Sequence, residues 1–475
     1  MSQSVTSTPA FSRLSPTTGT RSAWVVVAML VLFQVIAFAD KAVLGLVASR
    51  AIPDLGITSV EFGFIGSAFF FLYSIVSILT GMIATRVAVS WVLLTLGLIW
   101  AVLQFPMLLG GGAAVLLVTR IVLGGAEGPA TAMSLTSAHS WFAPNRRALP
   151  SNLVAAGSAL GPVIAAPLLT VVIVAWGWRW AFGVLGIVGL VWTIGWFLLG
   201  GDGPFGQKRA PRHGSEADVA GAAAPSSEAG GGDTIDTQRP VPTLRIFLSL
   251  TFLAAVIGGG SNFFVQGFLT TWLPQYLGTV IGLSTEAVGI VTVAPWVVGA
   301  ALLVGLGALG QRLMARGATA HTAIAVPFGI AALFAGTAFL LVPATAGPVA
   351  VAFLSAAAGC SIVYPMVASA LAYAVGARQR PLVLATLGGI ASVGAVISPT
   401  LVGWLMDRAG YTAPPKGSAP SSAMAEAMAT GVNQAFTLTG VLLILGGALC
   451  IAFLRPERFG AKLQALTEPR TETKE

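Results

Sequence analysis

Four ionisable residues lie deep inside otherwise apolar stretches of this chain: Asp40, Lys41, Arg120 and Glu127. The chain has 17 acidic residues in all, and nearly all of the others lie in polar segments or at the edges of apolar runs. A charged side chain at the centre of a membrane-spanning helix costs at least about 2.5 kcal/mol unless it is paired or hydrated. Two charges of each sign in two apolar stretches therefore indicate a functional site.

The spacing of these four residues suggests how they are arranged. Arg120 and Glu127 are seven residues apart, two turns of a helix, so both project from one face. Asp40 and Lys41 are neighbours and point about 100° apart, so one can face the helix of Arg120 while the other faces a central cavity.

The chemistry of such a cluster favours coupled binding of a proton and an organic anion. Burial favours the neutral form of a carboxyl group and a nearby cation favours the charged form. A substrate carboxylate that binds Lys41 or Arg120 would release Asp40 or Glu127 to take up a proton. The alternative is a set of buried ion pairs that only fixes helix packing.

The composition indicates a membrane protein. Of 475 residues, 56% are apolar and 9% are charged, whereas soluble proteins carry about 25% charged residues. The net charge of +8 does not indicate a nucleic-acid partner, because the basic residues lie between apolar runs. Cys360 and Cys450 lie in apolar runs without metal-ligand spacing. Neither a Walker sequence nor a Gly-x-Ser-x-Gly elbow is present, so we expect no metal, no cofactor and no enzymatic activity.

Twelve stretches are long and apolar enough to cross a membrane, which takes roughly 20 residues. This count places most Lys and Arg on one side, as the positive-inside rule requires. We therefore expect a multi-pass protein of the cell membrane (inner or plasma membrane) with both termini in the cytoplasm. The expected spans are 22–50, 62–84, 91–111, 113–138, 148–174, 181–200, 244–277, 287–310, 322–342, 348–375, 382–407 and 432–454.

One long polar interruption divides the spans into two sets of six. Residues 201–243 are rich in Gly, Ala, Pro and Ser and predict a flexible cytoplasmic linker. We expect a cytoplasmic tail at 1–21, six-helix bundles at 22–200 and 244–454, and a second cytoplasmic tail at 455–475. Residues 408–431 are expected to form an outer loop with a short amphipathic helix around Met424–Met428.

The two sets of spans resemble each other. Residues 55–63 and 281–289 carry similar capping sequences before the second and eighth spans, although a coincidence of helix caps is an alternative. Paired halves with a binding site between them, near the middle of the bilayer, are a transporter architecture.

The fifth and eleventh spans carry glycine and proline at matching places. Small residues let helix backbones approach closely, and proline bends a span. Such helices suit moving gates, for which we select Gly157, Gly161, Pro162, Gly394 and Pro399.

At these residues the chain resembles the major facilitator superfamily, and within it the anion:cation symporter family. The similarity runs from about residue 24 to 454, and the stretch from the fourth to the fifth span is its most specific part. The segments that carry it are Ala39-Asp40-Lys41-Ala42, Arg120-Ile121-Val122-Leu123-Gly124-Gly125-Ala126-Glu127-Gly128-Pro129, Trp141-Phe142-Ala143-Pro144-Asn145-Arg146-Arg147, Gly177-Trp178-Arg179-Trp180 and Trp272-Leu273-Pro274-Gln275-Tyr276-Leu277.

The resemblance implies an all-α fold of twelve transmembrane helices in two pseudo-symmetric halves, and a proton-coupled symporter of small organic anions that works by alternating access. The family's proton-binding carboxylates fall on Asp40 and Glu127, and its anion-contacting basic residues fall on Lys41 and Arg120. Protons, a small organic anion and the lipid bilayer are the implied partners, and we expect a monomer. A proton-coupled antiporter or efflux carrier is the alternative, because Gly157-x-x-x-Gly161-Pro162 resembles an antiporter signature.

Two further substrate contacts follow from the resemblance. A cavity-lining tyrosine of the second span falls on Tyr73, and a polar contact of the seventh span falls on Gln266. The alternatives are an ordinary core aromatic for Tyr73 and a helix-packing hydrogen bond for Gln266.

The sequence departs from the superfamily pattern in its cytoplasmic loops. The usual Gly-x-x-x-Asp-Arg pattern is Gly81-x-x-x-Thr85-Arg86 after the second span and Gly307-x-x-x-Gln311-Arg312 after the eighth. Without the Asp we expect the charge latch between the halves to be weakened or rebuilt. Lys41 also stands where the family has Arg, which replaces a planar two-pronged clamp with a point charge.

Overall fold

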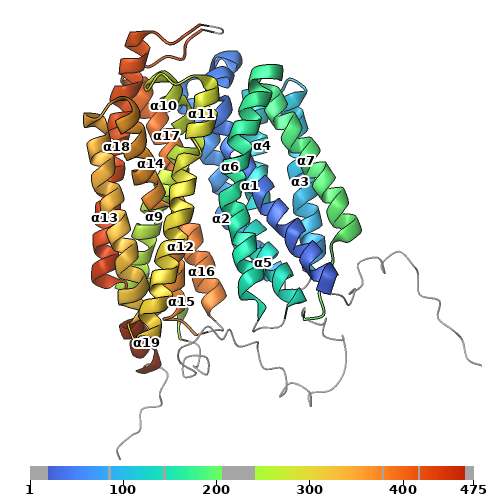
Figure 1. Cartoon of the computed structure of the whole chain (residues 1–475), viewed down its shortest axis with the longest axis vertical. Helices are drawn as coiled ribbons and strands as arrows, with labels where there is room; N and C mark the ends of the chain where they lie inside the picture. Colours follow the sequence, from blue (N-terminus) through green and yellow to red (C-terminus); the bar gives the residue numbers. More distant parts are fainter. Residues whose placement is uncertain are drawn as a thin grey trace, which may run out of the picture.

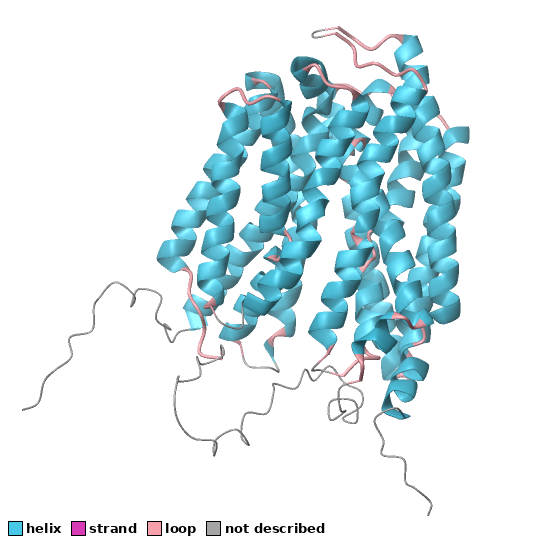
Figure 2. Cartoon of the chain, turned by 180° about the vertical axis from the view of Figure 1, so that it is seen from behind, coloured by secondary structure: helices cyan, strands magenta, loops and turns pink. Residues whose placement is uncertain are grey.

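The computed structural model describes residues 20–83, 87–142, 146–205, 241–376, 379–415 and 418–465. Within these ranges every regular element is a helix (Figure 2). Eleven helical stretches are long and apolar enough to cross a membrane, and the apolar segment Ser59–Tyr73 begins a twelfth. The expected all-α membrane fold is therefore confirmed. Most of the expected tails, the segment 206–240 of the expected linker, and Thr85 lie outside the described residues.

The first six spans form one bundle, called here the N half. Its large apolar side chains cover much of the outer surface, as in α7, where Val191 is 65% exposed and Leu198 is 71% exposed. Lipid rather than water suits such a surface. The helices are α1 (Thr20–Leu55), α2 (Ser59–Ile83), α3 (Val89–Leu108), α4 (Ala113–Glu127), α5 (Ala130–Trp141), α6 (Ala148–Trp176) and α7 (Trp178–Leu199).

The remaining spans form a second bundle, the C half, which packs beside the first (Figure 1). Its main helices are α8 (Thr243–Phe247), α9 (Leu250–Thr271), α10 (Leu273–Thr279), α11 (Thr285–Val291), α12 (Ala294–Ala315), α13 (Val326–Leu341), α14 (Gly347–Ser361), α15 (Pro365–Ala372), α16 (Arg380–Ala391), α17 (Val393–Arg408), α18 (Ser422–Phe453) and α19 (Pro456–Ala465). A π-helix at His321–Ala325 precedes α13 and a short 3-10 helix at Val342–Ala344 follows it.

Several spans consist of two helices each. Proline lies at four of these breaks, as Pro129 before α5, Pro274 in α10, Pro295 in α12 and Pro365 in α15. Proline has no N–H to donate, so it removes a hydrogen bond from the helix that precedes it. The eleventh span breaks at Ser392, just after two glycines.

The expected start of the last span is wrong. The helix α18 begins at Ser422 rather than near residue 432, and it includes the short helix expected around Met424–Met428. Ser421 caps this helix by accepting a hydrogen bond from the N–H of Met424 at 3.3 Å. Its first turns are rich in Ala and Met, which are good helix formers, although they are not apolar enough to be read as part of a span.

The two halves meet most closely between α2 and α17. A Cβ on Gly63 would lie 2.2 Å from the carbonyl oxygen of Pro399, and a Cβ on Gly403 would lie 2.4 Å from that of Ser59. Only glycine permits such close approach of two backbones. These contacts lie in the half of the bundle where α1 meets α2, called here the far end (top in Figure 1). The opposite end, where α5 and α19 lie, is called the linker end.

Candidate functional site: a buried charge cluster

The four intramembrane charges come together in the N half, as expected, and they pair crosswise. Lys41 Nζ lies 3.4 Å from Glu127 Oε2, and Arg120 Nη1 lies 3.9 Å from Asp40 Oδ1. Arg120 also donates a hydrogen bond of 3.1 Å to the backbone carbonyl of Asp40. Every one of these side chains is buried, with at most 8% of any residue exposed. Each acid is therefore matched with a base from the other helix.

The elements hold these residues at the middle of the bundle. Asp40 and Lys41 lie near the centre of the 36-residue helix α1. Glu127 is the last residue of α4, since the Gly128–Pro129 break follows it directly. A Cβ on Gly124 would lie 1.7 Å from the carbonyl oxygen of Phe69, so glycine lets α4 contact α2 directly. Glu127 follows one turn after this contact, and its side chain reaches Lys41 of α1.

Gln104 is a member of the cluster that the sequence reasoning missed. Gln104 Nε2 donates a hydrogen bond of 2.7 Å to Asp40 Oδ2, and Gln104 is 3% exposed. A buried amide in the third span was the available signal, because polar groups inside lipid require partners.

The cluster retains unused capacity for polar ligands. Within the described residues no hydrogen bond reaches Asp40 Oδ1, Arg120 Nη2 or either carboxylate oxygen of Glu127. Buried polar atoms without partners are costly. The role of these atoms in binding a ligand or a proton stays a prediction, and a set of ion pairs that only fixes helix packing stays the alternative.

Aromatic rings surround the Lys41 ammonium group. It lies 4.0 Å from the centre of the Phe38 ring and 5.1 Å from that of Tyr73. The guanidinium carbon of Arg120 lies 5.4 Å from the centre of the Phe182 ring. Such cation–π contacts stabilise a cation without neutralising it, in addition to the carboxylate that each basic group already contacts.

Tyr73 and Gln266 have different relationships to the cluster. The Tyr73 ring lies 5.1 Å from the Lys41 ammonium group and packs against the apolar core of the N half, and Tyr73 is not among the residues that line the pocket. Gln266 is half-buried on α9, and its backbone carbonyl accepts a hydrogen bond of 2.9 Å from the hydroxyl of Thr270. The substrate contacts assigned to both residues stay predictions.

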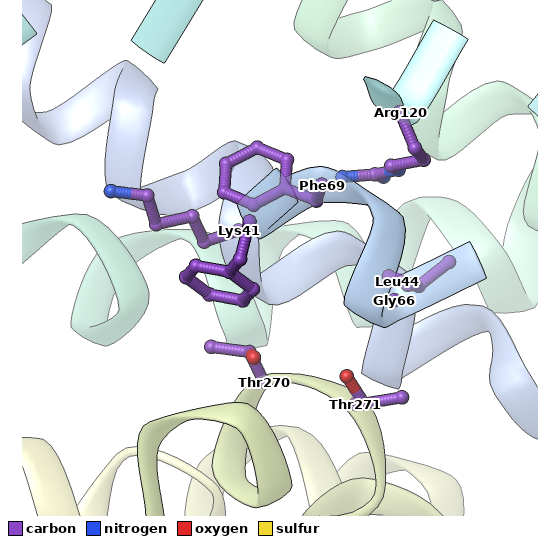
Figure 3. Close-up of a pocket in the computed structure, with 8 residues that line it drawn as sticks. Lys41, Leu44, Gly66, Phe69, Arg120, Thr270 and Thr271 are labelled. Atoms are coloured by element: carbon purple, nitrogen blue, oxygen red, sulfur yellow. The ribbon is translucent and has the colours of Figure 1, made fainter. Parts of the chain in front are cut away.

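A small pocket opens between the halves beside the cluster (Figure 3). Lys41 and Arg120 reach it from the N half, and Thr270 and Thr271 reach it from the C half. Its water-accessible volume is about 10 Å³, which is room for about one water molecule. Its other lining residues are Leu44, Gly66, Phe69 and Phe70.

The expected gating residues occupy two kinds of place. Gly157 and Gly161 pack within the N half, where a Cβ would lie 2.7 Å from the carbonyl oxygen of Val31 and 2.6 Å from Phe38 Cβ. Pro162 lies inside α6 beside them. Their gating role stays a prediction.

In the eleventh span, Gly394 and Pro399 lie at contacts of α17. A Cβ on Gly394 would lie 2.1 Å from the carbonyl oxygen of Gly260 in α9. The carbonyl of Pro399 accepts a hydrogen bond of 2.8 Å from Trp272 Nε1 and also faces α2 of the other half. Gln311, which stands in place of the superfamily's loop Asp after the eighth span, is exposed on α12.

The fold and its charge cluster define a class of protein: a multi-pass helical membrane transporter. No group of three or more His, Cys, Asp or Glu side chains among the described residues could hold a metal ion. The family model of the Major Facilitator Superfamily matches residues 29–355. The chain therefore belongs to the major facilitator superfamily and is a transporter rather than an enzyme.

Curated relatives and solved structures are similar along nearly the whole chain. The hexuronate transporter of Bacillus subtilis (strain 168) is 25% identical over 449 residues, which are 91% of this chain and 94% of that protein. The probable sulfoacetate transporter SauU of Cupriavidus necator is 26% identical over 81% of this chain and 87% of its own length. The crystal structure of a bacterial homolog of the human lysosomal transporter Spinster has a TM-score of 0.71 at 19% identity, and covers 94% of this chain and 99% of that one. These relatives agree with the resemblance to the anion:cation symporter family.

Proposed function

We propose that the chain is a proton-coupled symporter of small organic acid anions. In this proposal Lys41 and Arg120 bind the anion, and Asp40 and Glu127 bind protons. The crosswise pairing of the four charges carries the proposal, because each base that could bind an anion already holds an acid. The names of the hexuronate and sulfoacetate transporters support the choice of organic acids as substrates.

Electrostatics alone supplies the coupling. The four side chains carry two positive and two negative charges, so the unoccupied cluster is neutral when all four are ionised. An added monoanion leaves one uncompensated negative charge in a buried site, which is strongly unfavourable. Uptake of one proton by Glu127 or Asp40 restores neutrality, so anion and proton are favoured to bind together.

Alternating access would follow from motion of the two halves around this cluster. We propose that residues 22–200 and 244–454 move as the two bodies, with the pocket between Lys41 and Thr271 at their interface. We propose that the linker end lies in the cytoplasm, because most of the basic residues are expected there and the positive-inside rule favours that orientation. The far end then faces outward.

Uptake into proteoliposomes tests the proposal, with D-glucuronate and sulfoacetate as labelled probes. We expect Asp40→Asn and Glu127→Gln to abolish uptake driven by an inward proton gradient and to retain exchange of labelled for unlabelled anion, because exchange needs no net proton movement. Glu426→Gln is the control, since Glu426 is exposed on α18. Gradient-driven uptake that survives both substitutions would refute the proposal, and uptake that rises with an outward proton gradient would indicate an antiporter.

A further inference from the structure

The helix break in the seventh span lies directly at the pocket. Helix α9 ends at Thr271 and α10 begins at Leu273. Pro274 has no N–H, so the carbonyl of Thr270 lacks its usual partner four residues later. Irregular backbone at membrane depth is tolerated where it lines a cavity, and such breaks often form substrate sites.

Two adjacent threonines at this break differ in what their hydroxyls do. Thr270 donates a hydrogen bond to the carbonyl of Gln266 in its own helix. The hydroxyl of Thr271 makes no hydrogen bond to any described residue, although this residue is only 1% exposed. In Figure 3 the hydroxyl oxygen of Thr271 points from α9 toward the N half. Thr271 therefore lines the pocket with a hydroxyl that is not used to cap its own helix.

A glycine of the N half leaves space for this hydroxyl. A Cβ on Gly66 would lie 2.9 Å from Thr271 Oγ1, which is closer than a carbon normally approaches. On the same side of the pocket Arg120 Nη2 lacks a hydrogen-bond partner. One small pocket thus combines two basic groups from one half with a free hydroxyl from the other.

We propose that Thr271 is the substrate contact of the C half and selects acids that carry a hydroxyl group. The acid group would lie on Lys41 and Arg120, and a hydroxyl on a neighbouring carbon would hydrogen-bond Thr271 Oγ1. The whole pocket is about one water in size, so it must widen as the halves move apart before such an acid can bind. A ligand held in this way joins the two halves. The inference rests on the proposed transport of organic anions and narrows the substrate to hydroxylated ones.

Substrate discrimination by Thr271 variants tests this inference. D-Glucuronate carries hydroxyl groups and sulfoacetate carries none. We expect Thr271→Val, which keeps the shape and removes the hydroxyl, to raise the KM for D-glucuronate about 3- to 10-fold, the equivalent of one hydrogen bond, and to change the KM for sulfoacetate less than about twofold. Thr271→Ser should restore D-glucuronate uptake.

Thr439→Val is the matched control, because the hydroxyl of Thr439 is buried in the C half and bonds only to its own helix. An equal rise in KM for both probes in Thr271→Val would overturn the proposal that Thr271 selects substrates with a hydroxyl group. Transport of sulfoacetate but not D-glucuronate by the unaltered protein would overturn it too, while leaving organic-anion transport intact. Transport of neither would refute both proposals.

A separate observation concerns the contact between the halves at the far end. Helix α17 ends in Gly403-x-x-x-Asp407-Arg408, the Gly-x-x-x-Asp-Arg pattern that the loops after the second and eighth spans lack. Gly403 lets α17 contact the backbone of Ser59. Asp407 Oδ2 then accepts a hydrogen bond of 2.9 Å from the N–H of Val60, in the first turn of α2. A carboxylate at this position satisfies a free N–H and also interacts favourably with the helix dipole.

We infer that Asp407 is a latch that holds the far end closed, at the end of the bundle opposite to the loops that lack the charge latch. Breaking it should shift the population toward molecules open at the far end. Loss of a helix-capping contact typically costs about 0.5–2 kcal/mol, which corresponds to a shift of about 2- to 30-fold.

Labelling of a cysteine at the pocket tests the latch. Cys360 and Cys450 are first replaced with Ala, and Leu44→Cys then reports access of a membrane-impermeant maleimide to the pocket from the outer face of intact cells. We expect Asp407→Ala and the milder Asp407→Asn to increase the labelling rate at least about twofold. Arg408→Gln is the control, because Arg408 contacts Trp404 of its own helix. An unchanged labelling rate in folded Asp407 variants, verified by gel filtration, would overturn the latch.

Discussion

Lys41 pairs with Glu127 at 3.4 Å, although Asp40 is its neighbour in the chain. Asp40 instead faces Arg120, whose Nη1 lies 3.9 Å from its Oδ1. Both pairs thus join α1 to α4, so any ligand that displaces one partner also changes the contact between two helices.

The Lys41–Glu127 pair should show strong energetic coupling. We expect Lys41→Met or Glu127→Gln alone to destabilise the protein by about 3–5 kcal/mol if the remaining partner stays charged, because a buried charge loses its counter-charge. The double variant should lose clearly less than the sum of the two single losses. Thermal unfolding in detergent micelles measures all three, and losses that add within about 0.5 kcal/mol would show that the two residues act independently.

Gln104 should support the cluster through its hydrogen bond to Asp40. Gln104→Leu leaves Asp40 Oδ2 without its 2.7 Å donor, and we expect a loss of about 1–3 kcal/mol. Gln311→Leu is the matched control, because Gln311 is exposed on α12 and should change stability by less than about 0.5 kcal/mol. The unfolding midpoints of the two variants test this prediction. Equal midpoints would show that the hydrogen bond from Gln104 does not stabilise the charge cluster.

Gly124 should be intolerant of any side chain. A Cβ there would lie 1.7 Å from the carbonyl oxygen of Phe69, so Gly124→Ala must push α4 away from α2. We expect a loss of at least about 1–3 kcal/mol together with reduced uptake of D-glucuronate. Gly305→Ala meets no atom within 4 Å and should be neutral or slightly stabilising. Equal stability of the two alanine variants would contradict the close contact of α4 with α2.

Tyr73 should contribute to substrate binding through its hydroxyl, because its ring lies beside the Lys41 ammonium group. Tyr73→Phe keeps the ring beside Lys41, so stability should be unchanged while the KM for D-glucuronate rises about 3- to 10-fold. Tyr73→Leu should also lose the cation–π contact and lower the melting temperature. An unaltered KM in Tyr73→Phe would instead identify Tyr73 as an ordinary core aromatic.

Much of the fold was predictable because hydropathy is a local property. Each span needs about 20 apolar residues and each intramembrane charge stands out against them, so the spans and the residues Asp40, Lys41, Arg120 and Glu127 followed from the sequence. The start of α18 did not, because residues 422–431 are helical through capping and helix propensity rather than through apolarity.

The tertiary structure decided which of these charges pair and what joins them. The sequence placed Asp40 and Lys41 about 100° apart, but the rotation of α1 against α4 determines which acid meets which base. Gln104 donates to Asp40 across 64 residues of sequence, and Asp407 accepts from Val60 across 347 residues. Thr271 and Lys41, which line the same pocket, are 230 residues apart. Contacts over such distances depend on how whole helices pack, and spacing along one helix does not determine that packing.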